Sequence, residues 1–347
     1  MDTVWPRLAL YESRDLLSRY YRKKHGGDIN ATKAQEIIAH LAQGRDYFSS
    51  ARQASELVKP LLQYYGVLAL ARAVILFNER SMTEGALDPS HGVNPHRWTE
   101  TISDNKSTLL EMQLQTCGGT FTAFCKATRN KEASRIRVTG LNPFVIFTRV
   151  GTSIPEMSVV SLRDLLGRIP ALLYTYRRVF EEPGFCHYVK LLYYRDMGMT
   201  QISFADDECP PNSDSIRRIF RVPEGASIGT GDCSGVSAQS ALEYQVAVKS
   251  GDDWERLMPH VSTNASGFCF LIEPLSGGVD LSTASKLFLL SYAGSSLVRY
   301  YPSLWLSLTQ RKKGDAGFPL LKEAIALIDE EFPRRVVNEL EEPARHL

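Results

Sequence analysis

The segment that most constrains this chain is KPLLQYYGVLALARAVILF, which runs from Lys59 to Phe77. At helical spacing it is apolar on nearly every side, and Arg72 is the only charge between Lys59 and Glu79. A helix without a polar face must be surrounded by other elements, so we expect this one at the centre of a helical bundle. Pro60 fits its first turn, where a missing N–H matters least.

Helical patterns recur toward both ends of the chain. The residues over 6–25 predict a helix that ends at Gly26-Gly27, and a second helix follows Asn30, weakened or divided by Gly44. Near the other end, we expect Pro302 to distort or terminate the first of two long helices. These two helices are predicted for DLSTASKLFLLSYAGSSLVRYYPSLWLSLTQ and PLLKEAIALIDEEFPRRVVNELEE.

The middle of the chain has a different pattern, with short runs rich in Thr, Val and Phe that are typical of strands. The segment SMTEGALDPSHGVNPHRW, which precedes them, reads as an ordered loop. One helix is expected near 162–181, capped by Ser161 and kinked or split by Pro170. The predicted strands are GTFTAFCKAT, SRIRVTG, PFVIFTRV, HYVKLLYY, MTQISF, RIFRV, LEYQVAVK and GFCFLIEP.

This order of elements predicts an α+β fold with a mainly helical body. We expect residues 1–105 to form an N-terminal helical part and residues 106–279 a β-rich central region containing the helix near 162–181. Residues 280–347 should form C-terminal helices that pack on the N-terminal part, because long helices at both ends can bury their apolar faces against each other.

Charge and cysteine usage narrow the class of protein. The 40 basic and 39 acidic residues leave a formal charge of +1, so nucleic-acid binding is possible but gains no support from net charge. The six cysteines show no C-x-x-C spacing, which argues against a zinc site and predicts no metal. No signal-peptide pattern opens the chain, and the run from Leu287 to Val298 is shorter than the roughly 20 residues that span a bilayer. We therefore expect a cytoplasmic protein without a membrane partner.

Five phrases stand out in their order along the chain: VWPRLALYESRDLLSRYY, VKPLLQYYGVLALARAVI, the HG at His91-Gly92, SLRDLLGRIP and FLLSYAGSSLVRYYPSLW. Taken together and in this order, they resemble the YaaC-like family of prokaryotic proteins. The resemblance covers nearly the full chain, and it implies no established reaction, cofactor or catalytic residue.

Two arginines stand within the apolar helices, Arg72 in the central one and Arg299 near Pro302. An unpaired buried charge is costly, so each should meet a carboxylate, a cluster of backbone carbonyls or an anionic ligand. An ion pair inside the bundle is the structural interpretation. In the functional one, Arg72 and Arg299 bind a ligand together with the neighbouring Tyr65 and Tyr300.

The stretch RYYRKKH places Arg19 and His25 on one predicted helix. This spacing resembles the R-x(4–6)-H signature of HEPN-type ribonucleases, which implies an arginine that stabilises a phosphate and a histidine that acts in metal-independent RNA cleavage. The alternative is a basic helix end, where cations favour the helix dipole. If the chain is an enzyme, this reading makes Arg19, His25 and Arg299 its catalytic candidates.

Two further patterns are weaker. His91 and His96 stand four residues apart but flank Gly92 and Pro95, which disfavour a helix that could present both to a metal. The stretch PEGASIGTGDCSGVSAQSAL contains Gly229 and Gly231, which could cradle a phosphate, although a loop between strands accounts for them as well. No cofactor is predicted.

Because no catalytic constellation is complete, the leading hypothesis is a non-catalytic binding or assembly subunit of a bacterial intracellular complex, with defence or stress response as its setting. Such a subunit would bind a protein partner or self-associate. The alternatives are a metal-independent HEPN-like ribonuclease and a nucleotide-binding protein.

Overall fold

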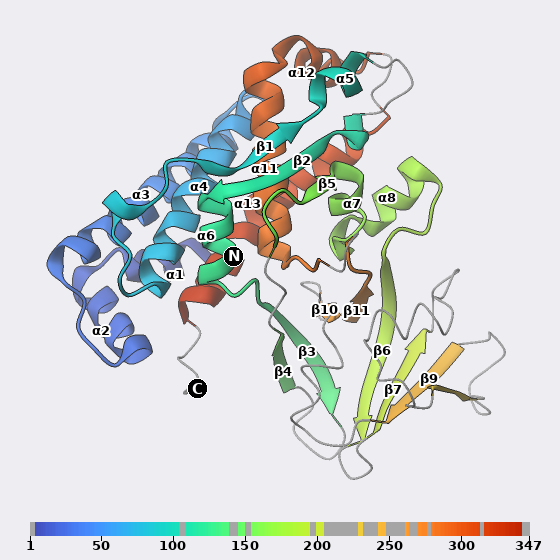
Figure 1. Cartoon of the computed structure of the whole chain (residues 1–347), viewed down its shortest axis with the longest axis horizontal. Helices are drawn as coiled ribbons and strands as arrows, with labels where there is room; N and C mark the ends of the chain where they lie inside the picture. Colours follow the sequence, from blue (N-terminus) through green and yellow to red (C-terminus); the bar gives the residue numbers. More distant parts are fainter. Residues whose placement is uncertain are drawn as a thin grey trace. The chain divides into compact units, whose positions relative to one another are not determined.

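The computed structural model of the protein has an α+β fold with a mainly helical body, as predicted (Figure 1). It describes residues 4–103, 109–138, 145–149, 154–194, 199–204, 228–231, 242–247, 261–263, 269–275, 279–312 and 316–341. The chain divides into two units. One comprises Met1–Asn130, Ser153–Leu165 and Thr283–Leu347, and the other Lys131–Thr152 and Leu166–Ser282.

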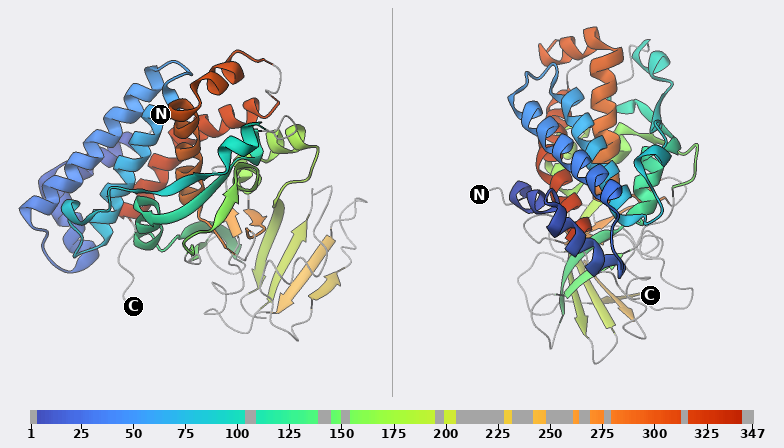
Figure 2. Two further views of the ribbon diagram at one scale, coloured as in Figure 1. Left: turned by 45° about the horizontal axis from the view of Figure 1, so that its top comes forward. Right: turned by 90° about the vertical axis from the view of Figure 1, so that its left-hand side faces the viewer.

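The first unit is built around helices from both ends of the chain, which pack on one another. In Figure 2, α3 and α4 lie side by side along most of their length. Helices that lie wholly in this unit are α1 (Val4–Tyr11), α2 (Arg14–His25), α3 (Ala31–Gln53), α4 (Lys59–Asn78), α5 (Trp98–Ser103), α6 (Thr120–Ala127), α11 (Thr283–Tyr300), α12 (Pro302–Thr309) and α13 (Phe318–Glu341).

Helix α4 is the predicted central helix, and α3, α6, α11 and α13 all pack against it. Fourteen of its residues are buried, including Tyr64 and Phe77 on different sides. Among the described residues, α4 is long and apolar enough to span a membrane, but 78% of its most apolar window is buried inside the protein. The core of a helical bundle accounts for this composition.

Helix α3 continues unbroken through Gly44, so the prediction that this glycine weakens or divides the helix is wrong. The Asn30 side chain accepts a hydrogen bond from the Lys33 N–H and caps the start. A Cβ on Gly44 would lie 2.6 Å from Leu70 of α4, and one on Gly66 would lie 2.7 Å from the Phe48 ring of α3. The two glycines therefore serve the close contact between α3 and α4.

A small antiparallel sheet of order β1-β2-β5 also belongs to the first unit. Its strands are β1 (His91–His96), β2 (Gln113–Gly119) and β5 (Val159–Ser161). Strand β1 and helix α5 occupy the end of the segment predicted to be a loop, which corrects that prediction. Pro95 is tolerated because β1 is an edge strand paired on one side only, opposite Leu114 at this residue.

The segment GTFTAFCKAT is another correction, because it forms helix α6 instead of the predicted strand. Phe121, Phe124 and Cys125 are buried at i, i+3 and i+4, which is the spacing of one helix face. The β-favouring residues are thus overridden by packing, since α6 contacts α4, β1 and β2.

Both predicted proline breaks are present. Helix α11 ends at Tyr300, and Pro302 begins α12. The helix expected near 162–181 consists of α7 (Leu162–Leu166), a 3-10 turn η3 (Pro170–Leu172) that starts at Pro170, and α8 (Leu173–Phe180). Two more 3-10 turns are η1 (Glu84–Ala86) and η2 (Leu109–Glu111).

The second unit holds the larger sheet, in which β6 pairs with β7, β11 and, in parallel, β3. Gly229 and Gly231 lie in β8 opposite Gln245 and Glu243 of β9, which corrects the predicted loop at these two positions. The predicted strand RIFRV lies outside the described residues. The strands are β3 (Glu132–Val138), β4 (Val145–Arg149), β6 (Cys186–Tyr194), β7 (Met199–Phe204), β8 (Ile228–Gly231), β9 (Leu242–Ala247), β10 (Val261–Thr263) and β11 (Cys269–Ile272).

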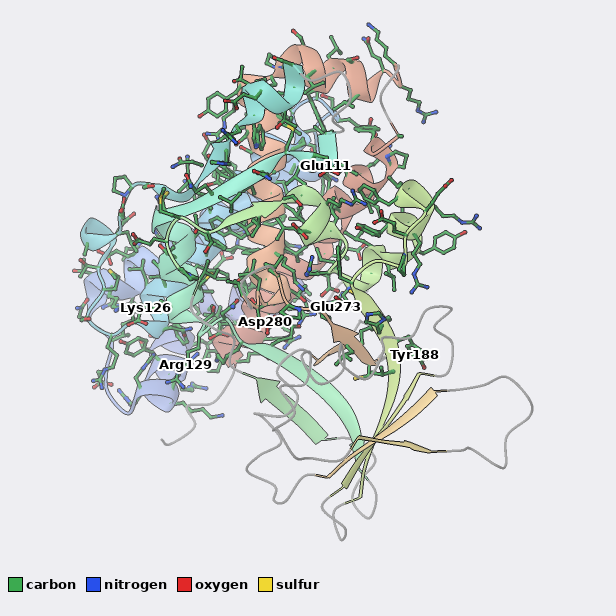
Figure 3. All side chains as sticks on the ribbon, turned by 45° about the vertical axis from the view of Figure 1, so that its right-hand side comes forward. Glu111, Lys126, Arg129, Tyr188, Glu273 and Asp280 are labelled. Carbon is green, nitrogen blue, oxygen red and sulfur yellow. The ribbon has the colours of Figure 1, made fainter. Side chains whose placement is uncertain are left out.

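Hydrogen bonds in the second unit link its helical segment to β11 and β6. Arg168 donates to the Glu273 carbonyl at 2.8 Å and to the Pro274 carbonyl at 3.0 Å. The Glu273 carboxylate, labelled in Figure 3, lies 2.9 Å from Nε2 of His187, which is buried. These contacts give Arg168 and His187 structural roles.

Candidate functional site

Arg72 of α4 and Arg299 of α11 are two half-buried cations without counter-ions. Nε of Arg72 and both Nε and Nη2 of Arg299 are buried without a hydrogen-bond partner. Within the described part of the chain, neither guanidinium forms an ion pair with a carboxylate. The predicted ion pair inside the bundle is therefore not found among these residues, and the guanidinium groups are left with unused donors.

The aromatic side chains around Arg299 come from α4 and α11. Its guanidinium carbon lies 5.8 Å from the ring centre of Tyr64 and 5.0 Å from that of Tyr300. The rings of Tyr64 and Tyr292 are 5.5 Å apart. Cations are attracted to the faces of such rings, but this attraction is weak compared with an ion pair. The aromatic rings therefore offset only part of the free-energy cost of burying the Arg299 charge, and an anion would offset more of it.

His91 joins these residues from the start of β1. Its Nδ1 lies 2.7 Å from the Tyr64 hydroxyl, and its ring centre lies 5.6 Å from that of Tyr292. Gly92 follows with φ +78°, where the β1–β2 register shifts, and a Cβ there would lie 2.8 Å from the Phe121 nitrogen. Only glycine fits this conformation and space, so Gly92 sets the course of the chain beside His91.

Helical spacing explains why α4 and α11 present these groups to the same region. Tyr64 and Arg72 are eight residues apart on α4, about two turns, and Tyr292 and Arg299 are seven apart on α11. Ser295 lies between the latter two, fully buried, with no hydrogen-bond partner for its hydroxyl. We call Tyr64, Arg72, His91, Tyr292 and Arg299 the arginine–tyrosine site.

Burial and the two arginines fix the protonation of this site. Burial lowers the pKa of His91 below its usual value, and the charges of Arg299 and Arg72 lower it further. Burial raises the pKa of Tyr64 and of Tyr292. At neutral pH both hydroxyls keep their protons and His91 is neutral, so the arginines give the site a positive charge.

His40 of α3 lies on the Arg72 side of the bundle. Burial lowers the pKa of His40, the Glu84 carboxylate raises it, and the Arg72 charge lowers it. Nε2 of His40 is 3.3 Å from the Glu84 carboxylate. The Glu84 carboxylate is thus at ion-pair distance from His40, and among the described residues no ion pair joins it to Arg72.

The other residues predicted to bind a ligand differ in their distance from the arginine–tyrosine site. Tyr300 is 59% exposed next to Arg299. Tyr65 is half-buried and stacks on Tyr47 with ring centres 5.5 Å apart. Gly229 and Gly231 belong to the other unit and lie in the ladder between β8 and β9.

Arg19 and His25 occupy different sides of α2, because six residues correspond to about 600° of helical rotation, which leaves them about 120° apart. Arg19 is exposed. His25 is half-buried, with Nε2 2.8 Å from the Phe77 carbonyl and its ring 4.3 Å from the Tyr21 ring. Burial lowers the pKa of His25. The ribonuclease hypothesis stays a prediction that these contacts do not favour.

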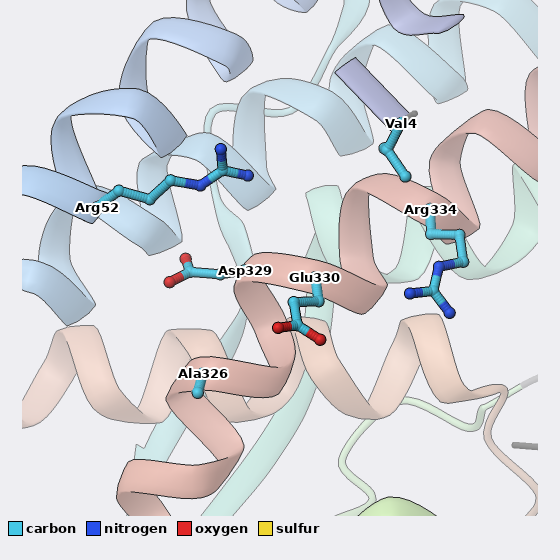
Figure 4. Close-up of a pocket in the computed structure, with 6 residues that line it drawn as sticks. All are labelled: Val4, Arg52, Ala326, Asp329, Glu330 and Arg334. Carbon is cyan, nitrogen blue, oxygen red and sulfur yellow. The ribbon is translucent and has the colours of Figure 1, made fainter. Parts of the chain in front are cut away.

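A separate hollow of about 420 Å³ is bordered by α1, α3 and α13, and Figure 4 shows six residues that line it. Its charged side chains are Arg52, Asp329, Glu330 and Arg334. The Asp329 carboxylate also meets Lys59 at 2.5 Å. Opposite charges therefore alternate here, whereas the arginine–tyrosine site carries charge of one sign.

Two histidines that we considered as a metal pair lie on one strand, His91 at its start and His96 at its end. Across the described segments, no three His, Cys, Asp or Glu side chains are grouped so that they could hold a metal ion. The sequence interpretation missed the contact between His91 and Tyr64. The only sequence feature that pointed to this contact was Gly92, which directly follows His91 and marks an irregular start of the strand.

Comparison with known proteins gives a match to a protein family over most of the chain. The family model described as "YaaC-like Protein" matches residues 9–340. Searches of curated proteins and of solved structures found no match.

Proposed function

The chain belongs to the YaaC-like protein family, and we propose that it is a non-catalytic binding subunit of a bacterial intracellular complex that holds an anionic ligand in the arginine–tyrosine site. The observation that carries this proposal is the pair of half-buried guanidinium groups, Arg72 and Arg299, whose buried nitrogens have no partner.

Desolvation makes the two unpaired guanidinium groups costly. Moving a cation out of water costs free energy that a facing carboxylate usually offsets, and neither arginine has one among the described residues. An anion bound between them would supply the missing attraction and accept the unused N–H groups. The position on two facing helices of the core makes the site a fixed one.

The surrounding groups favour binding over reaction. Burial raises the pKa of Tyr64 and of Tyr292, so both hydroxyls stay protonated at neutral pH and are poor nucleophiles. Nδ1 of His91 is engaged by the Tyr64 hydroxyl. Tyr64 lies beside a base in His91, but burial keeps its hydroxyl protonated, so we propose that these groups orient an anion and do not attack it.

Thermal unfolding of the full chain with inorganic phosphate or sulfate tests the proposal. We expect the melting temperature to rise with anion concentration for the native chain and to be flat for Arg72→Gln and Arg299→Gln. The matched control is Arg19→Gln, which changes an exposed arginine of α2 and should keep the native response. An equal rise in all four proteins would contradict the proposal.

A further inference from the structure

We propose that the anion taken by the arginine–tyrosine site is the terminal phosphate of a phosphate monoester. This inference rests on the proposed function and deepens it by naming the chemical class of the ligand. Three observations support it: the charge that the site presents, the directions from which its donors come, and the exposed tyrosine beside it.

The charge of the site matches a dianion. Helix α4 contributes Tyr64 and Arg72, helix α11 contributes Tyr292 and Arg299, and β1 contributes His91. None of these groups is a carboxylate, and among the described residues neither guanidinium forms an ion pair. A phosphate monoester carries close to two negative charges above its second pKa of about 6. A carboxylate or a phosphodiester carries one, which would leave one cation without a counter-charge.

The donors converge from three elements. Arg72 comes from α4, Arg299 from α11 and His91 from β1, where Nδ1 accepts the Tyr64 O–H and leaves Nε2–H as the donor of the neutral ring. A monoester has three terminal oxygens arranged as a tripod, whereas a carboxylate has two oxygens in one plane and a diester has two terminal oxygens. Guanidinium forks bind such oxygens two at a time. Donors on three sides therefore fit the tripod best.

The organic group esterified to the phosphate, here called the carrier, would extend out of the site past Tyr300. Arg299 lies between the buried ring of Tyr64 and the ring of Tyr300, which is 59% exposed. We therefore expect the ester group of a phosphate held by Arg299 to extend toward the exposed ring of Tyr300. A planar carrier such as a nucleobase could stack there, and a sugar carrier would use only the phosphate contacts.

Isothermal titration of the full chain at pH 8 with four small anions separates charge from shape. Methyl phosphate is a dianion with three terminal oxygens, methyl sulfate has the same shape with one charge, dimethyl phosphate has one charge and two terminal oxygens, and acetate is planar. We expect methyl phosphate to bind at least tenfold more tightly than the other three. Arg72→Gln and Arg299→Gln should each remove that preference, while Arg19→Gln keeps it.

Equal affinity for methyl phosphate and methyl sulfate, lost in both arginine variants, overturns the monoester inference and leaves the proposed anion site standing. Absence of binding for all four anions overturns both. Modification of native protein by phenylglyoxal gives a readout that needs no variant, because methyl phosphate should protect Arg72 and Arg299 at concentrations where methyl sulfate does not. Equal protection by the two anions also overturns the inference.

The carrier is then identified with AMP and glucose 6-phosphate. Tighter binding of AMP that is lost in Tyr300→Ala assigns an aromatic carrier. Equal binding of the two, unchanged in Tyr300→Ala, assigns a carrier without a ring system. Both outcomes support a phosphate monoester, and failure of both compounds to bind contradicts it.

Discussion

Lys33 carries a positive charge into the interior of the first unit, where it is only 4% exposed. Its ammonium donates to the carbonyls of Glu79, Arg80 and Met82 at 2.6, 2.9 and 2.9 Å. These carbonyls directly follow the last turn of α4, where unpaired carbonyls and the helix dipole both attract a cation. Lys33 of α3 is therefore the cap for the C-terminal end of the central helix.

Replacement of Lys33 by Met should lower the free energy of unfolding by about 2–4 kcal/mol, because three carbonyls lose a charged donor that water cannot easily replace. Urea denaturation measures the change. Lys23→Met, at an exposed position of α2, is the control and should change stability little. Equal effects of the two substitutions would show that the three carbonyls are satisfied in another way.

Arg299→Met should raise the free energy of unfolding by about 1 kcal/mol in anion-free buffer, because it removes a half-buried cation that has no ion-pair partner among the described residues. The gain should vanish when phosphate is added, since the native chain is then stabilised and the variant is not. Chemical denaturation with and without phosphate measures both values. A destabilised Arg299→Met without anion would argue that the guanidinium already has a favourable partner.

Part of the candidate site could be predicted from the sequence. Arg72 and Arg299 are charges within apolar segments, and a charge in such a segment can be recognised from the local sequence alone. His91 could not be placed, because Gly92 and Pro95 obscure a strand that exists only through pairing with β2. The contact between His91 and Tyr64 joins strand β1 to helix α4, and no local sequence pattern predicts such a tertiary contact.

At the scale of elements, the contact between α3 and α4 depends on two reciprocal glycines. Gly44 of α3 faces Leu70 of α4, and Gly66 of α4 faces Phe48 of α3. Leu70 and Phe48 are both fully buried, so neither side chain has free space into which it could move. The distance between the helices is therefore set by the absence of two Cβ atoms.

Gly66→Ala should destabilise the protein by about 1–3 kcal/mol through overpacking, even though alanine favours a helix by about 1 kcal/mol. Thermal or urea unfolding measures the effect. Gly85→Ala is the matched control, because a Cβ at Gly85 meets nothing within 4 Å. Phe48→Leu in the Gly66→Ala background should restore part of the lost stability, and no restoration would count against the steric explanation.

Long elements whose apolar residues recur with a clear helical period could be predicted, and short elements could not. The spacing of apolar residues identified α4 and α11 because each buries many residues over several turns. Helix α6 was mistaken for a strand because Thr and Phe favour strands locally, while contacts with α4 and β2 decide its form. Gly44 was read as a break because helix propensity carries no information on a facing Leu70.

At the scale of the whole molecule, three histidines link stability to pH. Burial lowers the pKa of His25, His40 and His91 below the ordinary value of about 6.5. The unfolded chain therefore binds protons at a higher pH than the folded protein does. Their contribution to stability is present above about pH 6.5 and is lost as the pH falls toward the lowered pKa values.

We expect the melting temperature to fall between pH 7.5 and 5.5, with each histidine contributing about 1.4 kcal/mol per unit by which its pKa is lowered. Single replacements of His25, His40 and His91 by Gln should each flatten this dependence. His96→Gln is the comparison variant on β1. A pH dependence that none of the three replacements changes would assign the acid sensitivity to other groups.

The overall architecture was largely accessible from the sequence, because the α+β class and the helical patterns at both ends follow from periodicity. The family resemblance was confirmed over residues 9–340. The division into units was harder to foresee, since residues 109–130 and 154–165 belong with the helices by tertiary contacts and not by composition.

The first unit draws its core from both ends of the chain, which has a consequence for synthesis on the ribosome. Helix α4 is complete at Asn78, but α11, which covers one of its faces, begins only at Thr283. At 5–20 residues per second, the nascent chain holds an apolar helix without that cover for about 10–40 seconds. During that interval α4 is a natural binding segment for the chaperones that meet nascent chains, and slower translation should increase the protein's dependence on them.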